Sequence, residues 1–406
     1  MTSTPDQSFR SPWLTLWLSP RLTIEGIVGT RPRHLVLLLA ILGAMAGLYG
    51  ELVAFGAEGL LADWRFWLGF VLICAIVGPV WLYISALILN WISRLLGGRA
   101  PPLALRAVIA WSAVPSILGF VVVLIAGAVA GDRLPQHNIL AVLVGAFGLW
   151  STVVFMLMLA RVQHFGFWRT IATYVLNAVL VSFLLAVSIR TLLYQPFNVP
   201  AASMMPTLLV GDYFFVEKFT YGYSRFSLPF SPPLFSGRIL ASEPQRGDVV
   251  VFRAPNDVST DFVKRVVGLP GDRIQMKDGR LYLNDMPVTR ERIADYAGGA
   301  ACGSATSRPV KRWRETLANG RSYETLDCVD NGFYDNTNLF TVPPGHVFVM
   351  GDNRDNSIDS RVLRQMGYVP YENLVGRVRM IFFSRAAGEG GAAPVVRTER
   401  IGMLVR

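Results

Sequence analysis

The 406-residue sequence predicts a membrane α-helical N-terminal region of about five transmembrane helices followed by a mostly β domain. Three observations lead to this fold class. Only 16% of the residues are charged, below the roughly 25% usual in soluble domains. Long runs without charge are confined to residues 1–190. Short alternating apolar runs bounded by Gly, Pro and Asp begin near Val199 and are typical of strands. This pattern excludes a wholly soluble enzyme and a disordered chain.

Five apolar segments are long enough to cross a bilayer, which takes about 20 residues. They are roughly Leu35–Gly50, Phe66–Ser93, Ala107–Gly131, Asn138–Ala160 and Thr170–Ile189. The first is the shortest, because only 17 residues separate Arg33 from Glu51. Pro79 and Pro115 lie inside such segments, where we expect kinks rather than breaks.

The arginines predict the orientation of these segments. Nine of them lie in the leader and in the second and fourth connections, against two in the first and third. The positive-inside rule therefore places the N-terminus in the cytoplasm and everything after about Arg190 on the outer side. Because the arginines alternate with apolar runs and form no long basic block, the net charge of +10 does not indicate a nucleic-acid partner.

These patterns divide the chain into three parts. We expect a multi-pass membrane module at 1–165, a transmembrane anchor at 166–192 and a β domain at 193–406. Runs such as Asp248–Arg253, Arg280–Asn284, His346–Met350 and Val375–Phe383 are the expected strands. A more polar stretch at about 284–338 is expected to be an inserted arm.

Two of the three cysteines, Cys302 and Cys328, fall in the outer domain, where an oxidising compartment permits a disulfide. Closing that loop contributes about 3–4 kcal/mol on the chain-entropy model. The sequence leaves open whether the pair is bridged. The four histidines show no metal-ligand spacing, and there is no nucleotide-binding loop, so neither a metal nor a cofactor is expected.

Lysine is scarce, with four lysines against 34 arginines. One of them, Lys264, lies in the apolar run Asp261-Phe-Val-Lys-Arg-Val-Val-Gly268, and on a strand it shares a face with Phe262. Burial of that face would lower the lysine pKa from about 10.4 and provide a general base at neutral pH. The alternative is a surface lysine whose stem covers apolar neighbours.

Ser203 is the candidate nucleophile. It follows Ala201 and Ala202 and precedes Met204, and the nearby Pro206 prevents regular helix. Small neighbours let a substrate backbone approach closely, as acyl transfer requires. The alternative is an ordinary turn serine beside a proline.

Three motifs in this order resemble the bacterial type I signal peptidases, which release secreted proteins from their signal peptides. Ser203–Leu208 is similar to the nucleophile box of that family, and Lys264–Asp272 is similar to its general-base box. The third motif is similar to the Gly-Asp-Asn signature of the family. It is present in full as Gly351-Asp-Asn-Arg-Asp-Asn-Ser-Ile-Asp-Ser-Arg361. A membrane segment directly before the first box agrees with the same resemblance.

The resemblance implies a membrane-bound serine endopeptidase with Ser203 as nucleophile and neutral Lys264 as general base. Secretory preproteins would be its substrates, in the bacterial inner membrane with the catalytic domain on the periplasmic side. Supporting roles are implied for Ser357, Asp359 and Arg361. Substrate-binding positions are implied for Phe197, Val199, Pro200, Met204 and Phe262.

One position departs from the family pattern. Many members carry a serine two residues before the nucleophile, whose hydroxyl helps to form the oxyanion hole, and this chain has Ala201 there. Removal of an oxyanion donor costs about 2.7–4 kcal/mol of transition-state stabilisation in another serine protease.

The leader Ser11-Pro-Trp-Leu-Thr-Leu-Trp-Leu-Ser-Pro20 and the helices after it resemble the Yip-type membrane family. This resemblance implies a scaffold with membrane lipid or a membrane protein as partner. Two alternatives to the peptidase follow: a non-enzymatic membrane scaffold whose outer domain is a decayed protease, and a transporter with an accessory domain. The absence of charges within the apolar segments argues against the transporter.

Overall fold

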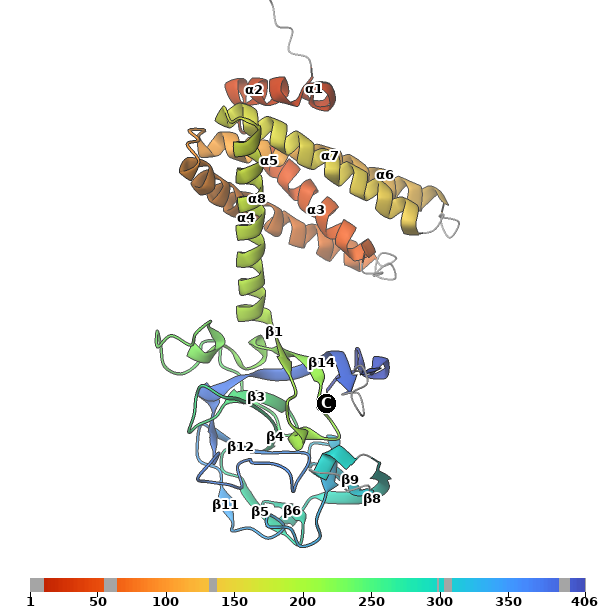
Figure 1. Ribbon diagram of the computed structural model, residues 1–406, viewed down its shortest axis with the longest axis vertical. Coiled ribbons are helices and arrows are strands. Elements are labelled where there is room, and N and C mark those ends of the chain that lie inside the picture. Colours follow the sequence, from red (N-terminus) through yellow and green to blue (C-terminus); the bar gives the residue numbers. More distant parts are fainter. Residues whose placement is uncertain are drawn as a thin grey trace, which may run out of the picture. The chain divides into compact units, whose positions relative to one another are not determined.

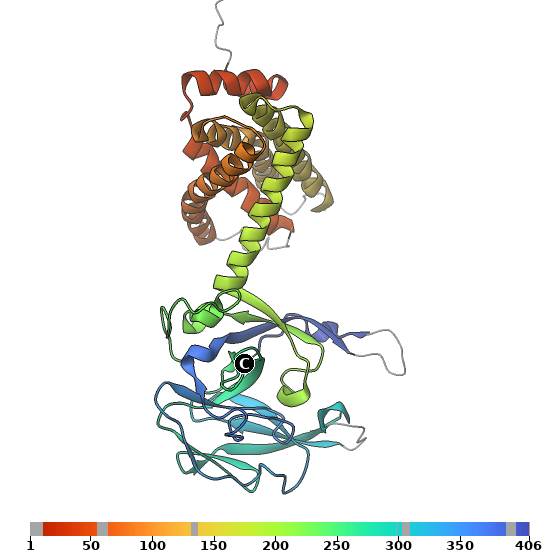
Figure 2. The ribbon, with the colours of Figure 1, turned by 60° about the vertical axis from the view of Figure 1, so that its left-hand side comes forward.

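The computed structural model describes residues 11–54, 64–130, 137–297, 299–302, 309–386 and 395–405. The chain divides into two compact units, Met1–Leu184 and Leu185–Arg406 (Figures 1 and 2). The first unit is helical and the second is mostly β, as the sequence predicts.

The first unit is built from helices that pack around a core containing Leu89, Leu105, Trp111 and Met158. Its described helices are α1 (Pro12–Leu18), α2 (Pro20–Thr30), α3 (Val36–Ala54), α4 (Trp64–Leu95), α5 (Pro102–Ser112), α6 (Val114–Ala130), α7 (His137–Gln163) and α8 (Phe167–Ser188), the last of which continues into the second unit. Neither α1 nor α2 is predicted from the sequence. Both begin at a proline, which is favoured in the first turn of a helix.

Four helical stretches among the described residues are long and apolar enough to cross a membrane. They are Phe66–Leu95, Pro102–Ala126, Val142–Gln163 and Phe167–Leu193, and they coincide with the last four predicted segments. The first predicted segment is a shorter apolar helix, Val36–Glu51. Large apolar side chains remain exposed along these helices, as lipid-facing surfaces require; examples are Leu72, Leu87 and Val179.

Pro79 lies within the continuous helix α4, and near Pro115 the backbone keeps helical dihedral angles at Ala113, with φ −76° and ψ −13°. The third apolar stretch is interrupted at Ala113, where α5 ends and α6 begins. Pro115 occupies the first turn of α6, the position at which its missing N–H leaves no helical hydrogen bond unmade.

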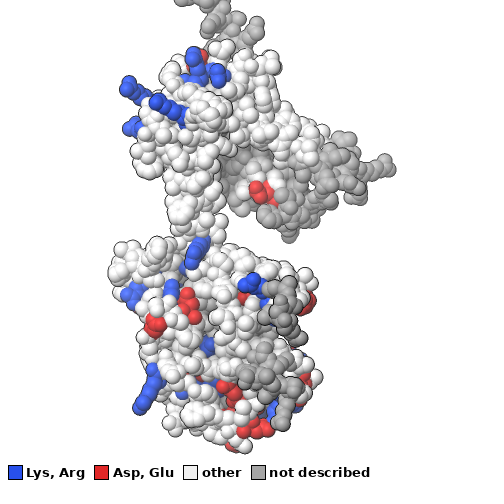
Figure 3. All heavy atoms as spheres, viewed as in Figure 1, with Lys and Arg blue, Asp and Glu red and all other residues white. Residues whose placement is uncertain are grey.

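Lys and Arg side chains gather at the end of the first unit that carries α1 and α2, and the surface along the remaining helices is largely uncharged (Figure 3). This is the asymmetry on which the orientation argument depends.

The second unit consists of antiparallel strands joined by long loops. Its described strands are β1 (Tyr194–Asn198), β2 (Asp212–Glu217), β3 (Val249–Arg253), β4 (Asp261–Gly268), β5 (Arg273–Lys277), β6 (Arg280–Leu283), β7 (Met286–Pro287), β8 (Thr289–Tyr296), β9 (Val310–Thr316), β10 (Ser322–Asp327), β11 (Phe340–Thr341), β12 (His346–Met350), β13 (Val369–Pro370), β14 (Leu374–Ala386) and β15 (Val395–Val396). The four strands expected from the sequence are β3, β6, β12 and β14.

These strands form three sheets in the described part of the chain. The largest has the order β1-β2-β14-β3-β4-β12-β13, with β15 paired to β14. A three-stranded sheet of β8, β9 and β10 lies within the predicted arm at about 284–338, of which residues 298 and 303–308 fall outside the described residues. The third sheet has the order β11-β5-β6-β7.

A buried carboxylate ties the end of the chain to the main sheet. Asp212, the first residue of β2, is fully buried and accepts hydrogen bonds from Ser384 Oγ (2.6 Å) and the Leu209 N–H (2.8 Å). Arg400 pairs with it at 2.6 Å and Arg397 lies 3.7 Å away. The four groups satisfy the charge that burial would otherwise make costly.

We expect Asp212→Ala to lower the free energy of unfolding by about 3 kcal/mol, because it leaves a largely buried guanidinium without its counterion. The measurement is thermal or denaturant unfolding of the detergent-solubilised full chain. Asp330→Ala, which removes the exposed partner of Lys311, is the matched control and should leave the unfolding temperature unchanged. Equal stability of the Asp212→Ala variant and the unaltered chain would contradict this account.

Candidate active site

Strand β4 carries two neighbouring cations, Lys264 and Arg265, which point to opposite faces of the main sheet because side chains alternate along a strand. Pairing with β3 sets Lys264 opposite Val250 and Arg265 opposite Val249. Both side chains are buried, with 3% and 1% of their residue surfaces exposed. Their environments differ, and the difference determines what each can do.

Lys264 lies against Ser203. Its Nζ is 2.7 Å from Ser203 Oγ and donates a hydrogen bond to the carbonyl of Val263 at 3.0 Å. Burial lowers the pKa of Lys264 to about 8, an effect that the carboxylates of Asp359 and Asp352 oppose and the guanidinium of Arg361 reinforces. Near neutral pH this amine therefore has an appreciable uncharged fraction that can accept a proton.

The carboxylates that could keep Lys264 charged are already paired with arginines. Asp359 is bound by Arg361 at 2.8 Å, and Asp352 by Arg265 at 2.7 Å. Lys264 itself forms no ion pair with any described residue. Desolvation is therefore the largest influence on the pKa of Lys264, and it outweighs the opposing effect of the two carboxylates.

The serine sits on a short 3-10 turn, Ala202–Met204, between β1 and β2. Val199 and Met204 on either side of it are buried in a core cluster with Phe214, whereas Ser203 is only half-buried. The N–H of Asn353 donates to the Ser203 carbonyl at 3.1 Å. The backbone around Ser203 is thus fixed while its hydroxyl remains open to a ligand.

Gly351 is the closest neighbour of this turn from the predicted Gly351–Arg361 box. A Cβ atom at this position would lie 2.2 Å from Ser357 Oγ and 2.6 Å from the Ser203 carbonyl oxygen, so only glycine fits. Ser357 Oγ and the Ser203 carbonyl therefore lie on either side of the space that a side chain at Gly351 would fill. Its buried Oγ has no hydrogen-bond partner in the part of the chain that the structure describes.

Asp359 and Arg361 form a buried ion pair. Arg361 Nε and Nη2 each donate to the Asp359 carboxylate at 2.8 Å, and the Gly351 N–H donates to it at 3.0 Å. Burial would raise the pKa of Asp359, but Arg361 and these hydrogen bonds together hold it below the ordinary value. The pair fixes the loop that begins at Gly351.

The pair of Arg265 with Asp352 was missed by sequence reasoning. Arg265 Nε and Nη2 donate to Asp352 at 2.8 and 2.7 Å, and Thr207 Oγ1 donates to the same carboxylate at 2.5 Å. This contact joins all three predicted motifs on the face of β4 opposite Lys264. An arginine inside an apolar strand was the available signal, because a buried arginine requires an anion.

The predicted substrate-binding residues differ in exposure. Phe197 is half-buried and stacks on Phe214 with ring centroids 6.1 Å apart. Pro200 is exposed, and half-buried Phe262 has its ring centroid 5.6 Å from Lys264 Nζ. Val199 and Met204 are closed to solvent in this structure.

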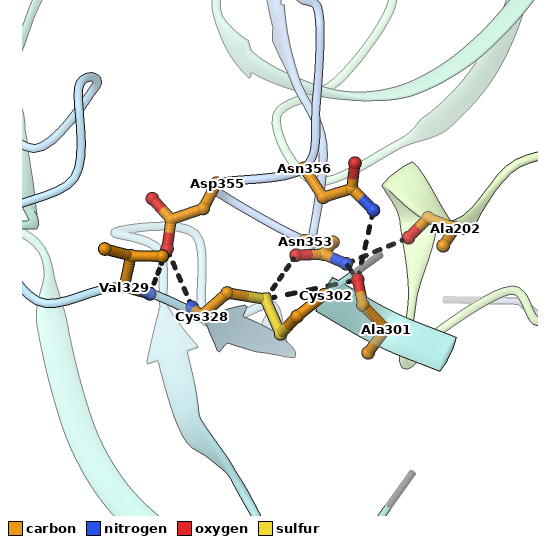
Figure 4. Close-up of a disulfide and its surroundings, with 8 residues drawn as sticks. All are labelled: Ala202, Ala301, Cys302, Cys328, Val329, Asn353, Asp355 and Asn356. Carbon is orange, nitrogen blue, oxygen red and sulfur yellow. Dashed lines mark hydrogen bonds between the residues drawn. A yellow bond between two sulfur atoms is a disulfide. The ribbon is translucent and has the colours of Figure 1, made fainter. Parts of the chain in front are cut away.

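Cys302 and Cys328 are bonded to each other in the structure, and the free thiol among the described residues is the buried Cys74 (Figure 4). The disulfide joins the short turn η7 (Gly299–Cys302) to the end of β10 and lies next to Asn353. No group of three or more His, Cys, Asp or Glu side chains within the described ranges is arranged to hold a metal ion.

Comparisons with known proteins assign both parts of the chain. The family model described as signal peptidase, peptidase S26, matches residues 171–383, more than half of the chain. The Yip1 domain model matches residues 14–189. The two matches overlap in α8, the helix that leads into the β unit.

Proteins with similar sequences carry the name of the same family. Signal peptidase I of Rickettsia typhi (strain ATCC VR-144 / Wilmington) is 45% identical over 208 residues, which cover 49% of this chain and 76% of that protein. Signal peptidase I of Rickettsia canadensis (strain McKiel) has the same identity and coverage. The crystal structure of a signal peptidase I from Enterococcus faecalis V583 is 27% identical, with a TM-score of 0.20, covering 34% of this chain and 97% of that chain.

Proposed function

This chain belongs to the signal peptidase family, peptidase S26, and we propose that its peptidase reaction is carried out by Ser203 as nucleophile and Lys264 as general base. Its substrates are preproteins that bear signal peptides. The observation that carries the assignment is the 2.7 Å approach of Lys264 Nζ to Ser203 Oγ.

The reaction begins with neutral Lys264, which takes the proton of the Ser203 hydroxyl as Oγ attacks the scissile carbonyl carbon. The backbone N–H of Ser203 is proposed to donate to the oxyanion, since Ala201 offers no hydroxyl. The tetrahedral intermediate then collapses, and the lysine gives its proton to the departing amine. An ester between Ser203 and the signal peptide remains. Lys264 next removes a proton from water, which hydrolyses this ester and frees the enzyme.

Three residues are proposed to support this pair without reacting themselves. Ser357 lies near the Ser203 backbone beside Gly351, and its buried hydroxyl has no hydrogen-bond partner among the described residues. Asp359 and Arg361 neutralise each other, which fixes the loop without restoring charge to Lys264. Phe197, Val199, Pro200, Met204 and Phe262 are proposed to bind the small side chains that precede the cleavage site.

The scaffold alternative, a decayed protease, is disfavoured because Ser203, Lys264 and Ser357 are all retained and lie together. The protein is one of the inner membrane, and we propose that its N-terminus is cytoplasmic and its catalytic unit periplasmic. We propose the boundaries 1–165 for the Yip-type module, 166–192 for the anchor and 193–406 for the catalytic domain. Lipid or a membrane-protein partner is proposed for the module.

Ser203→Ala and Lys264→Ala should each lower cleavage of a secretory preprotein at least about a thousandfold, because each removes one half of the proton transfer. The measurement is cleavage by the purified full chain in detergent. Lys277→Ala, which removes a lysine of β5 that lies over Tyr282, is the matched control and should cleave at the unaltered rate. Retained cleavage by either dyad variant, with folding verified, would reject the assignment.

The pH dependence of kcat/KM should follow the charge of Lys264. Only the neutral amine accepts the serine proton, so kcat/KM should rise with pH, with a midpoint near the pKa of about 8, and level off above it. Below the midpoint it should fall tenfold per pH unit. Steady-state rates from pH 6 to 10 with one preprotein test this. A profile that is flat, or that falls as the pH rises through 8, would count against a neutral lysine base.

A further inference from the structure

The disulfide, the nucleophile turn and the Gly351–Arg361 box meet at one side chain, Asn353 (Figure 4). Asn353 is fully buried. Its N–H donates to the Ser203 carbonyl at 3.1 Å, and its Nδ2 donates to the Ala202 carbonyl at 3.2 Å. Asn353 therefore forms hydrogen bonds to the backbone carbonyls of two consecutive residues, the proposed nucleophile and the residue before it.

The side-chain amide of Asn353 also forms a hydrogen bond to the segment that contains Cys302. Asn353 Nδ2 donates to the carbonyl of Ala301 at 2.5 Å, and Ala301 directly precedes Cys302 in η7. Asn356 Nδ2 donates to that carbonyl as well, at 3.0 Å. Asn353 Oδ1 lies 3.5 Å from Cys328 Sγ, which is a packing contact because a disulfide sulfur has no proton to donate.

The far side of the disulfide is fixed independently of η7. Asp355 Oδ2 accepts hydrogen bonds from the N–H groups of Cys328 and Val329, at 2.7 and 3.0 Å. Leu326 of β10 is packed with Met205, two residues after the serine. Cys328 is thus anchored to the box, and the S–S bond is the covalent link that holds Cys302 and Ala301 to this anchor.

We propose that the Cys302–Cys328 disulfide helps to position Ser203, acting through Ala301 and Asn353, so that peptidase activity depends on the oxidised pair. This inference rests on the proposed function of Ser203. Asn353 is a positioning residue in this scheme, because it touches the nucleophile backbone and not the reacting atoms. Its bonds to Ala202 and Ser203 persist without the disulfide, so reduction weakens the site and does not abolish it.

The redox step balances with a dithiol as reductant. The dithiol gives two electrons and two protons to the S–S bond, which becomes two thiols at Cys302 and Cys328, while the reductant becomes a disulfide. Reoxidation requires a disulfide oxidant, which accepts the two electrons and two protons of the thiols, becomes a dithiol and re-forms the Cys302–Cys328 bond. Cys74 lies in the other unit and takes no part.

The test compares preprotein cleavage by the full chain in detergent before and after dithiol treatment, with thiols counted by alkylation and mass spectrometry. We expect reduction to lower kcat about tenfold with little change in KM, and reoxidation to restore it. Cys74→Ala should respond like the unaltered chain. The double variant Cys302→Ser with Cys328→Ser should have the lowered kcat before any dithiol is added, and dithiol treatment should not change it.

Asn353→Ser separates positioning from general stabilisation. If the disulfide acts through Asn353, the two changes are not additive, so this variant should have a lowered kcat that dithiol lowers little further. A dithiol effect of the same factor in Asn353→Ser and in the unaltered chain would overturn the inference and assign the disulfide a merely structural role.

The remaining outcomes also discriminate. Fully reduced, unaltered enzyme that cleaves at the oxidised rate would overturn the inference and leave the proposed function intact. Cleavage that persists in Ser203→Ala would instead overturn the proposed function, and this inference with it.

Discussion

The candidate site depends on the desolvation of one amine. Lys264 and Arg265 are adjacent on β4, and both are taken out of water. Arg265 keeps its charge, because Asp352 binds it in two places. Among the described residues, Lys264 Nζ has the Ser203 hydroxyl and the Val263 carbonyl as its hydrogen-bond neighbours. Alternation along a single strand thus produces one structural cation and one weak base, and the arginines at Asp352 and Asp359 preserve the difference.

The remaining structure of the β unit holds this arrangement in place. Pairing of β4 with β3 and β12 fixes the position of Lys264 in the main sheet. The buried side chains of Val199 and Met204 hold the turn that carries Ser203. The Gly351–Arg361 box packs against the turn that carries Ser203. Because Gly351 has no side chain, its backbone can lie close to the Ser203 carbonyl. Preorganisation of this kind requires that the groups be held before substrate arrives.

Much of this was predictable from the sequence, and the reasons for the failures are physical. Long charge-free runs and strand alternation predicted the two units, and the scarcity of lysine, together with its apolar neighbours, singled out Lys264. Ser203 and Lys264 are 61 residues apart, and only the family resemblance predicted that they lie close together. Periodicity predicts where strands occur but not which residues of different segments pair. Arg265, Asp352 and Asn353 were missed for the same reason, since each acts through a distant partner.

The most direct test of the central claim is titration of Lys264 itself. The chain has four lysines, so ¹³C labelling at the lysine ε-carbon gives a spectrum simple enough to assign, with the Lys264 signal identified by its absence in Lys264→Arg. Lys218, another buried lysine with a pKa of about 8, is identified in the same way with Lys218→Arg. The account predicts that Lys264 titrates with a midpoint near pH 8 in the detergent-solubilised full chain. A midpoint near pH 10 or above would show a permanently charged amine and contradict its role as a neutral base.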